Sequence, residues 1–501
     1  MVSRRKLVRK KVKPMEVTHP EEVKEVYVFL FLGLLTLFMM FIMASNNSPL
    51  IQYIGPDSGI YLLIGKHLNR GAVLYKDLFD HKGPIIFFFN ALPQLFIKGP
   101  TGVWILEVLC MFMSVVLMYK IAYKILKTKA SILIPMVYLW MTSSLMTGGS
   151  YAEEYSNVFA IVSIYIFVNW VETQDQQLYP WQSYVLGVCT AMTFFMKPNT
   201  VAVIAAVILL IGVLTLRNTP RKAIAYSVYG ILGLLTITVP LLLYHYSQHT
   251  LAEMFNATLL HNLRYSKVGL EQKHWSIFLD SSFKIWRFGM FSVITYGFIR
   301  CQIYKDRLYG FFLGLSALLV YISVSVGGRD FRYYLVIGVP LVVFALICVM
   351  KHGTVELKRL LNKRRQVLIG VLLFIMAYRA YGSHPIAQRD TIMQYKQDIK
   401  ALAKHIPEDE KTQVFGYDMP AMWFYVNDIM PIYPYFTMQS WMAKSDPSIT
   451  RELNDFALST KPKWIVTYDE LAGENPVLKR ELAQNYKQVT HNSSGFLYQR
   501  K

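Results

Sequence analysis

Charged residues are scarce in this chain. They make up 17% of its 501 residues, whereas hydrophobic residues make up 54%. A soluble protein of this length carries about a quarter charged residues. The apolar residues also gather in runs of the ~20 residues that a helix needs to cross a bilayer. The composition therefore excludes a soluble globular protein and predicts an all-α polytopic membrane protein.

Cysteines are few as well. The four that occur are Cys110, Cys189, Cys301 and Cys348, which lie in or beside apolar runs without CxxC spacing. They are therefore expected to be small buried hydrophobic residues, and neither disulfides nor metal ligands. A cleavable signal peptide is not expected, because the first apolar run is too long and no small-residue cleavage pattern follows it.

Acidic residues are fewer than basic ones: Asp and Glu number 32, Lys and Arg 52, and the formal charge is +20. A strongly basic chain can bind nucleic acid. Here, however, the basic residues adjoin apolar runs, at the N-terminus and near residues 119–129, 217–222, 300–307 and 351–365. Cytoplasmic loops of membrane proteins have this bias. We therefore expect these clusters to be cytoplasmic and predict no nucleic-acid partner.

About eleven membrane spans are expected, at residues 26–44, 103–126, 132–147, 155–171, 183–196, 200–216, 223–244, 284–299, 308–326, 333–350 and 367–381. If the N-terminal segment 1–25 is cytoplasmic, an odd number of spans places the C-terminus outside, and every basic cluster then falls inside. This pattern predicts a multi-pass protein of the plasma membrane with a transmembrane domain over residues 26–382.

Two shorter segments do not fit an ordinary span. Segment 84–97 is apolar but too short, so a half-buried or re-entrant helix on the outer face is expected. Segment 59–68 has apolar positions at helical spacing and is expected to lie along the membrane surface.

The composition becomes polar after residue 382. Helix-like stretches at 391–406 and 448–458 occur among strand-like stretches at 412–418, 463–469 and 495–500. This pattern predicts a small α/β domain over residues 383–501, outside the membrane.

With this topology, ionisable side chains converge on the outer loops. These loops contain Asp57, Asp77, Asp80, His81, Lys82, Glu153, Glu154, Lys197, Arg329 and Arg332, with Tyr333 directly after the last. Each has a structural alternative. Asp57 could be the N-cap of a helix that begins at Ser58, the two glutamates could cap another helix, the other carboxylates could stabilise turns, and the lysines could reach lipid phosphates. Gathered on one face in Gly/Pro-punctuated loops, they favour a functional site.

The first of these loops, GPDSGIYLLIGKHLNRGAVLYKDLFDHKGP at residues 55–84, resembles the first outer loop of the GT-C glycosyltransferases. The resemblance is to the dolichyl-phosphate-mannose–protein mannosyltransferase and aminoarabinose transferase branches. The matching positions are Asp57, Tyr61, Gly71, Tyr75, Asp77, His81, Lys82 and Pro84. Weaker matches are an acidic residue at 153 or 154, Lys197-Pro198 and Arg332-Tyr333-Tyr334. Two positions depart from the family pattern: Ser58 replaces a second acidic residue, and Gly83 replaces a proline. The resemblance covers roughly residues 25–350.

The resemblance implies an inverting transfer of a sugar from a polyprenyl-phosphate carrier. Such a displacement needs a carboxylate that takes the proton of the incoming hydroxyl and cations that stabilise the leaving phosphate. By position, Asp57 is the expected base, assisted by Glu154 or Glu153. Donor phosphate is expected at Lys82, Lys197, Arg329, Arg332 and Tyr333, and substrate contacts at Asp77, Asp80, His81 and Tyr61.

The expected partners are the lipid-linked sugar donor, the bilayer, and a glycan, glycolipid or protein acceptor. No cofactor is required, although a divalent cation could bridge acidic groups and phosphate. The alternative function is a transporter or a flippase for lipid-linked sugars. Transporters, however, place functional charges near the bilayer midplane, whereas these residues occur in outer loops.

Overall fold

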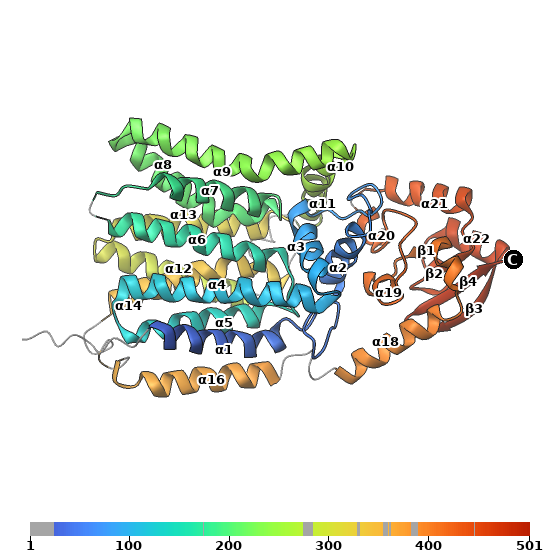
Figure 1. Ribbon diagram of the computed structural model, residues 1–501, viewed down its shortest axis with the longest axis horizontal. Coiled ribbons are helices and arrows are strands. Elements are labelled where there is room, and N and C mark those ends of the chain that lie inside the picture. The colour runs from blue at the N-terminus through green and yellow to red at the C-terminus, as the bar shows by residue number, and fades with distance from the viewer. Residues whose placement is uncertain are drawn as a thin grey trace, which may run out of the picture.

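The computed structural model describes residues 25–173, 175–273, 284–327, 331–353, 359, 362–381, 389–444 and 446–501. It consists of a bundle of long, roughly parallel helices and a smaller C-terminal part at one end of that bundle (Figure 1). Short helices α2, α3, α10 and α11 lie between the two, at the same end of the bundle.

The bundle is made of α1 (Glu25–Met43), α4 (Pro100–Leu126), α5 (Leu133–Leu145), α6 (Ala152–Glu172), α7 (Pro180–Phe194), α8 (Ala202–Asn218), α9 (Pro220–Ser247), α12 (Lys284–Ile303), α13 (Arg307–Ser325), α14 (Val339–Lys351) and α16 (Arg365–Tyr381). Each expected span lies on one of these helices. Within the described residues, 7 helices, some including an adjoining 3₁₀ turn, are long and apolar enough to cross a membrane. The chain is a multi-pass membrane protein.

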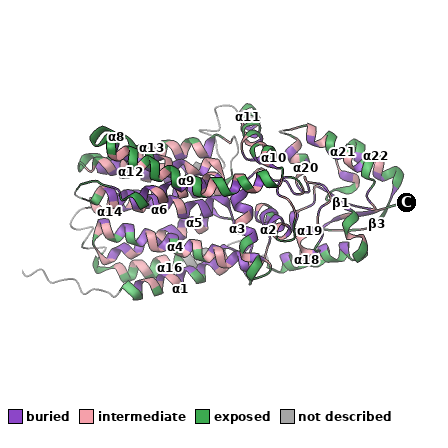
Figure 2. Cartoon of the chain, turned by 45° about the horizontal axis from the view of Figure 1, so that its top comes forward, coloured by how far each residue is buried: buried purple, intermediate pink, exposed green. Residues whose placement is uncertain are grey.

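The bundle helices differ in how far their neighbours cover them. The apolar window of α6 is 72% buried, whereas that of α9 is only 11% buried, so α6 is central and α9 peripheral (Figure 2). A small-residue contact attaches α9 to α7: a Cβ atom added at Gly187 would lie 1.9 Å from the carbonyl oxygen of Gly230. Glycine therefore permits the two backbones to approach closely.

The two short segments form helices at the end of the bundle. Helix α3 (Pro84–Phe96) is a 13-residue apolar helix, as the sequence predicts. Helix α2 (Pro56–Leu68), which was expected along the membrane surface, lies at this end of the bundle. It packs between α3 and α19 (Ala421–Val426) of the C-terminal part, and its residues from Ser58 to Gly65 are all buried. The apolar spacing is explained by protein contacts on both sides.

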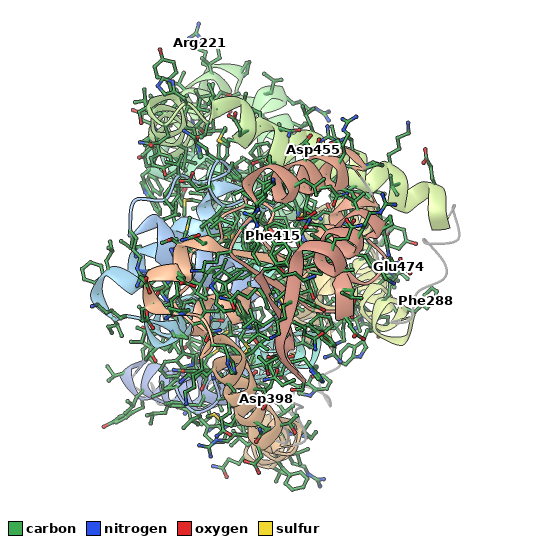
Figure 3. The ribbon with its side chains drawn as sticks, turned by 90° about the vertical axis from the view of Figure 1, so that its right-hand side faces the viewer. Arg221, Phe288, Asp398, Phe415, Asp455 and Glu474 are labelled. Carbon is green, nitrogen blue, oxygen red and sulfur yellow. The ribbon has the colours of Figure 1, made fainter. Side chains whose placement is uncertain are left out.

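The C-terminal part contains a four-stranded sheet in the order β1-β2-β4-β3. Its strands are β1 (Val414–Tyr417), β2 (Trp464–Thr467), β3 (Tyr486–Asn492) and β4 (Gly495–Arg500), and its other helices are α18 (Arg389–Ala403), α20 (Gln439–Ala443), α21 (Ser448–Thr460) and α22 (Pro476–Asn485). The pair β1–β2 is parallel, with Phe415 opposite Ile465, and the other two pairs are antiparallel. Figure 3 looks onto this part, with Asp455 on α21 and Asp398 on α18 at opposite margins. The predicted fold class is confirmed, although β3 and α22 were not predicted.

Candidate active site

The loop between α2 and α3 is joined tightly to the segment that follows α7. The N–H groups of Gly83 and Ile85 donate to the carbonyl oxygens of Met196 (3.2 Å) and Phe195 (3.0 Å). A Cβ atom at residue 83 would lie 2.1 Å from the Phe195 carbonyl oxygen, so only glycine fits. Proline, the residue of the family pattern, would also lack the donating N–H. This contact brings Lys82 into the neighbourhood of Lys197.

Asp57 lies at the start of α2 but does not cap it. The N-cap is Gly55, the helix begins at Pro56, and no side chain caps it. The half-buried Asp57 carboxylate instead accepts a hydrogen bond from the Tyr333 hydroxyl at 3.1 Å. Tyr333, from the 3₁₀ segment Arg332–Gly338, stacks on Tyr151 with ring centroids 4.5 Å apart. The loop between α5 and α6 and the 3₁₀ segment before α14 thus both help to position this carboxylate.

Lys82 is buried, with 7% of its surface exposed. Its Nζ donates to Nε2 of His81 at 2.9 Å and lies 4.0 Å from Asp80 Oδ1. Burial alone would lower the pKa of Lys82, but the carboxylates of Asp80 and Asp57 outweigh it and hold this pKa above its usual value. The ammonium therefore stays charged at neutral pH. A lysine that reached for lipid would not be enclosed in this way.

Lys197 is half-buried and pairs with a carboxylate. Its Nζ lies 2.5 Å from Glu153 Oε1 and 4.1 Å from the centre of the Tyr334 ring. Because Glu153 neutralises it, Lys197 contributes less net positive charge to the site than Lys82 does.

Asp80, His81 and Tyr61 surround Lys82. Asp80 accepts the Lys82 backbone N–H at 2.9 Å. Burial, together with the charge of Lys82, lowers the pKa of His81 well below its usual value, so the imidazole is neutral and accepts from the ammonium. The buried Tyr61 ring lies 6.0 Å from Lys82 Nζ.

Three aromatic rings pack around the His81 ring. This ring stacks on His261 at 5.6 Å and faces Tyr265 and Trp441, each at 6.1 Å. His261 ends a π-helical turn (Asn256–His261) that lies between α10 (Leu251–Phe255) and α11 (Asn262–Lys273), whereas Trp441 lies on α20. These segments carry no family motif in their sequence, so Tyr265 and Trp441 were not predicted.

Three expected residues lie apart from this group or cannot be placed in it. Asp77 Oδ2 accepts the Val73 N–H at 2.7 Å and so stabilises its own turn. Arg332 is described and opens the segment that carries Tyr333. Arg329 lies outside the described residues.

Glu154 interacts with Glu107, an acidic residue of α4 that was not predicted to belong to the site. Its Oε2 accepts the Ser150 N–H at 3.0 Å. Glu107, fully buried on α4, interacts electrostatically with Glu154 and accepts from Asn47 Nδ2 at 2.9 Å. Oε1 of each glutamate has no partner among the described residues. One acidic residue within the long apolar run of α4 is the signal that could have identified Glu107.

The site thus contains two lysines among three carboxylates, those of Asp57, Asp80 and Glu153, at one end of the bundle. Within the described ranges, no group of three or more His, Cys, Asp or Glu residues is placed to hold a metal ion. Lysine side chains pair with Asp80 and Glu153, whereas Asp57 accepts a hydrogen bond from the Tyr333 hydroxyl.

Similar folds occur in two solved glycosyltransferases. ArnT from Cupriavidus metallidurans is similar at a TM-score of 0.60 when bound to undecaprenyl phosphate and 0.63 in the apo state; in both cases identity is 13%, over 95% of this chain and 97% of that one. The apo oligosaccharyltransferase of Archaeoglobus fulgidus has a TM-score of 0.53 and 12% identity, over 96% of this chain and 75% of that one. The chain therefore has the GT-C fold, which confirms the resemblance seen in the first loop.

Comparison of the amino-acid sequence with known protein families assigns the chain to a family. No curated protein matches the chain. Residues 19–381 match a protein family described as the putative competence-induced protein Ccs4 N-terminal domain. This range includes the whole helical bundle and every lysine and carboxylate of the site. The chain belongs to the family of the putative competence-induced protein Ccs4 N-terminal domain.

Proposed function

We propose that this protein is a membrane glycosyltransferase that moves a monosaccharide from a polyprenyl phosphate to an acceptor on the outer face of the cell membrane. One observation carries the proposal: the Asp57 carboxylate and the buried, charged Lys82 occupy one cluster at the end of a GT-C bundle. The acceptor is an envelope glycan, a teichoic acid, a glycolipid or a protein.

Asp57 is the general base. It is half-buried, and the Tyr333 hydroxyl orients one oxygen at 3.1 Å. The acceptor oxygen attacks the anomeric carbon, its proton passes to Asp57, and the bond from that carbon to the phosphate oxygen breaks. A single displacement of this kind inverts the anomeric centre. The leaving phosphate is a weak base and needs no general acid.

Lys82 stabilises the charge that develops on the leaving phosphate. An ammonium has three N–H donors, and the neutral His81 ring accepts one of them. The fixed cation in a buried setting acts more strongly than it would in water. Lys197 is a weaker candidate, because a phosphate must compete there with Glu153. Arg329 and Arg332 remain further candidates, and a divalent cation is not required.

The ArnT structure bound to undecaprenyl phosphate supports a polyprenyl-phosphate carrier for this chain. A flippase is less well supported, because the clustered lysines and carboxylates gather at one end of the bundle.

The test is the variant Asp57→Asn, purified at full length in detergent and supplied with undecaprenyl-phosphate sugars. Asparagine keeps the shape and can accept from Tyr333, but it cannot take a proton, so turnover is expected to fall roughly 10²–10⁴-fold. Asp390→Asn, at an exposed position on α18, is the matched control and should keep full activity. Turnover within a few-fold of the parent in Asp57→Asn overturns the assignment of the base.

A further inference from the structure

One buried side chain, that of Asn46, joins two loops that lead to Asp57. The first loop lies between α1 and α2, at residues 44–55, and contains Asn46 itself. The second lies between α5 and α6, at residues 146–151. Only 1% of the surface of Asn46 is exposed. The sequence gave no reason to place it in the site, because it lies outside the motif that begins at Gly55.

Each polar group of Asn46 makes a hydrogen bond to one of these loops. Toward the α5–α6 loop, its backbone N–H donates to the Gly148 carbonyl at 2.8 Å and its Nδ2 to the Gly149 carbonyl at 2.9 Å. Toward α2, its Oδ1 accepts the Gly55 N–H at 3.1 Å and its carbonyl accepts the Ile54 N–H at 3.1 Å. Loss of the side chain would therefore remove one hydrogen bond from each loop.

The two loops close tightly around the Asn46 amide. A Cβ atom added at Gly55 would lie 2.8 Å from Asn46 Oδ1, and one added at Gly148 would lie 2.6 Å from the same atom. Both distances are well inside the ~3.5 Å of a normal contact between nonbonded atoms. Gly148 also has a φ of +100°, which glycine adopts readily and other residues do not. The backbone can thus enclose the amide only because both positions are glycine.

The backbone that enters α2 is strained at the point where Asn46 holds it. Ile54 directly precedes Gly55, the N-cap of α2, and has a φ of +53°. This left-handed conformation is rare for a β-branched residue, and it persists only where the surrounding structure imposes it. The Asn46 carbonyl and amide oxygen bind the N–H groups of these two residues. Asn46 therefore helps to set the direction in which α2 begins.

Both loops lead from Asn46 to the Asp57 carboxylate. On one side, Gly55 starts α2, which has Asp57 in its first turn. On the other side, the α5–α6 loop ends at Tyr151, whose ring stacks on that of Tyr333 with centroids 4.5 Å apart. The Tyr333 hydroxyl donates to Asp57 at 3.1 Å. These contacts form a closed ring that starts and ends at Asn46.

We propose that Asn46 is a positioning residue that holds the Asp57 carboxylate against the Tyr333 hydroxyl. Its importance for catalysis rests on the function proposed above, in which Asp57 is the base. A displacement of about 1 Å in a reacting group can cost ~10²-fold in rate. Lys82 lies between α2 and α3, outside this ring of contacts, so the loss of Asn46 should leave recognition of the donor phosphate intact.

The test observes this ring of contacts without sugar transfer. Full-length protein with 3-fluorotyrosine at residue 333 is placed in lipid nanodiscs, and its ¹⁹F NMR resonance reports the surroundings of the Tyr333 ring. Asn46→Ala should shift the resonance, because the two loops are no longer joined. Asn427→Ala is the matched control: it removes a buried amide of the C-terminal part that donates to the Trp423 carbonyl at 2.9 Å, and it should cause no shift. An unshifted resonance in Asn46→Ala, or an equal shift in the control, overturns the proposal.

A second variant disturbs the same contact from the side of α2. Gly55→Ala keeps the asparagine but adds the Cβ atom that would lie 2.8 Å from Asn46 Oδ1, so it should also shift the resonance. The φ of Gly55 is −63°, which alanine adopts without strain. If Asn46→Ala does not fold, Gly55→Ala decides alone, and an unshifted resonance in this variant overturns the proposal.

Kinetics tests the catalytic consequence separately. With undecaprenyl-phosphate sugars, kcat of Asn46→Ala should fall about 10–100-fold, whereas KM for the donor should stay close to that of the parent. A shifted resonance with unchanged kcat would show that the position of Asp57 does not matter for turnover, and would overturn the catalytic part of the proposal. A parent protein that transfers no sugar would reject the proposed function, and the ¹⁹F shifts would still decide whether Asn46 positions Asp57.

Discussion

The two site lysines illustrate how burial and partners distinguish residues that look alike in sequence. Lys82 and Lys197 each lie just before a helical segment at the same end of the bundle. Lys82 has a neutral histidine at 2.9 Å and a carboxylate only at 4.0 Å, whereas Lys197 has a carboxylate at 2.5 Å. The charge of Lys82 is therefore the more available for a phosphate.

We expect Lys82→Ala to lose most of its binding of undecaprenyl phosphate, because a phosphate then lacks its nearest unneutralised cation. Lys82→Arg should restore binding only in part, since a planar guanidinium does not replace a compact ammonium in an enclosed site. Binding is measured by the rise in thermal stability on addition of undecaprenyl phosphate. Lys98→Ala, at an exposed position after α3, is the control. An unchanged rise in Lys82→Ala would remove Lys82 from the donor site.

Glu107 contributes indirectly, because its carboxyl group lies against the backbone of the loop between α5 and α6. That loop has three consecutive residues with positive φ, Gly148, Gly149 and Ser150. A Cβ at Gly149 would lie 2.7 Å from Glu107 Oε1, so the loop backbone packs directly against this carboxyl group. We therefore expect Glu107 to position the loop that carries Tyr151 and leads to Glu153 on α6.

Glu107→Leu should destabilise the protein by about 1–3 kcal/mol, because the buried Nδ2 of Asn47 loses its acceptor. Glu107→Gln should cost much less, since its amide oxygen can still accept from Asn47 and its NH₂ group can donate to Glu154. Thermal unfolding of the two variants in detergent checks this. Equal stability of Glu107→Leu and the parent would show that the loop does not depend on this residue.

The sequence was a good guide to some of these residues and a poor guide to others. Asp57 and Lys82 lie in a dense family motif, so the resemblance to that family identified them, although their roles remain predictions. Glu107 could not, because its partners Asn47 and Glu154 lie in other segments and only the fold brings them together.

At the scale of elements, α2 is the helix that connects the membrane bundle to the C-terminal part. It packs on α3 and α19, with Asp57 in its first turn and His67 in its last turn. The long apolar runs made the bundle helices predictable from composition. The burial of α2 was not predictable, because a one-sided helix on a membrane and a helix between two protein layers share the same apolar spacing.

The contact between α2 and the C-terminal part is expected to weaken in acid. The pKa of His67 is about 4 when folded, against its usual 6.5, so between these values the unfolded chain binds more protons. Stability therefore falls as pH drops below 6.5, by about 2 kcal/mol at pH 5 from this residue.

The measurement is thermal unfolding at pH 7.5 and pH 5.0 for the parent and for His67→Gln. Glutamine cannot titrate, so the variant should lose less stability over this interval than the parent does. An identical loss in both would mean that His67 is not the source of the dependence.

At the scale of the whole molecule, the candidate site and the C-terminal part lie at the same end of the bundle (Figure 1). The basic loops, such as residues 217–222 between α8 and α9, lie at the other end. Charge bias predicts that the basic end is cytoplasmic.

We therefore expect a cysteine introduced by Ser440→Cys to react with a membrane-impermeant maleimide in intact cells. Asn218→Cys, at the C-terminal end of α8, should react only after permeabilisation. Both positions are exposed, and the native cysteines are buried or half-buried, so background labelling should be low. The reverse pattern would invert the predicted topology.

The contact of α2 with the C-terminal part also sets the order of events during synthesis. Lys66 Nζ donates to the carbonyl oxygen of Tyr425 across a separation of 359 residues. At about 5–20 residues per second, roughly 20–70 s pass between the translation of these two residues. Over that interval the side of α2 that α19 covers in the finished fold stays uncovered, because α19 has not yet been made. A partly made chain already has Asp57 and Lys82 but cannot yet hold them in their final arrangement, so the ribosome releases a competent molecule only near the end of translation.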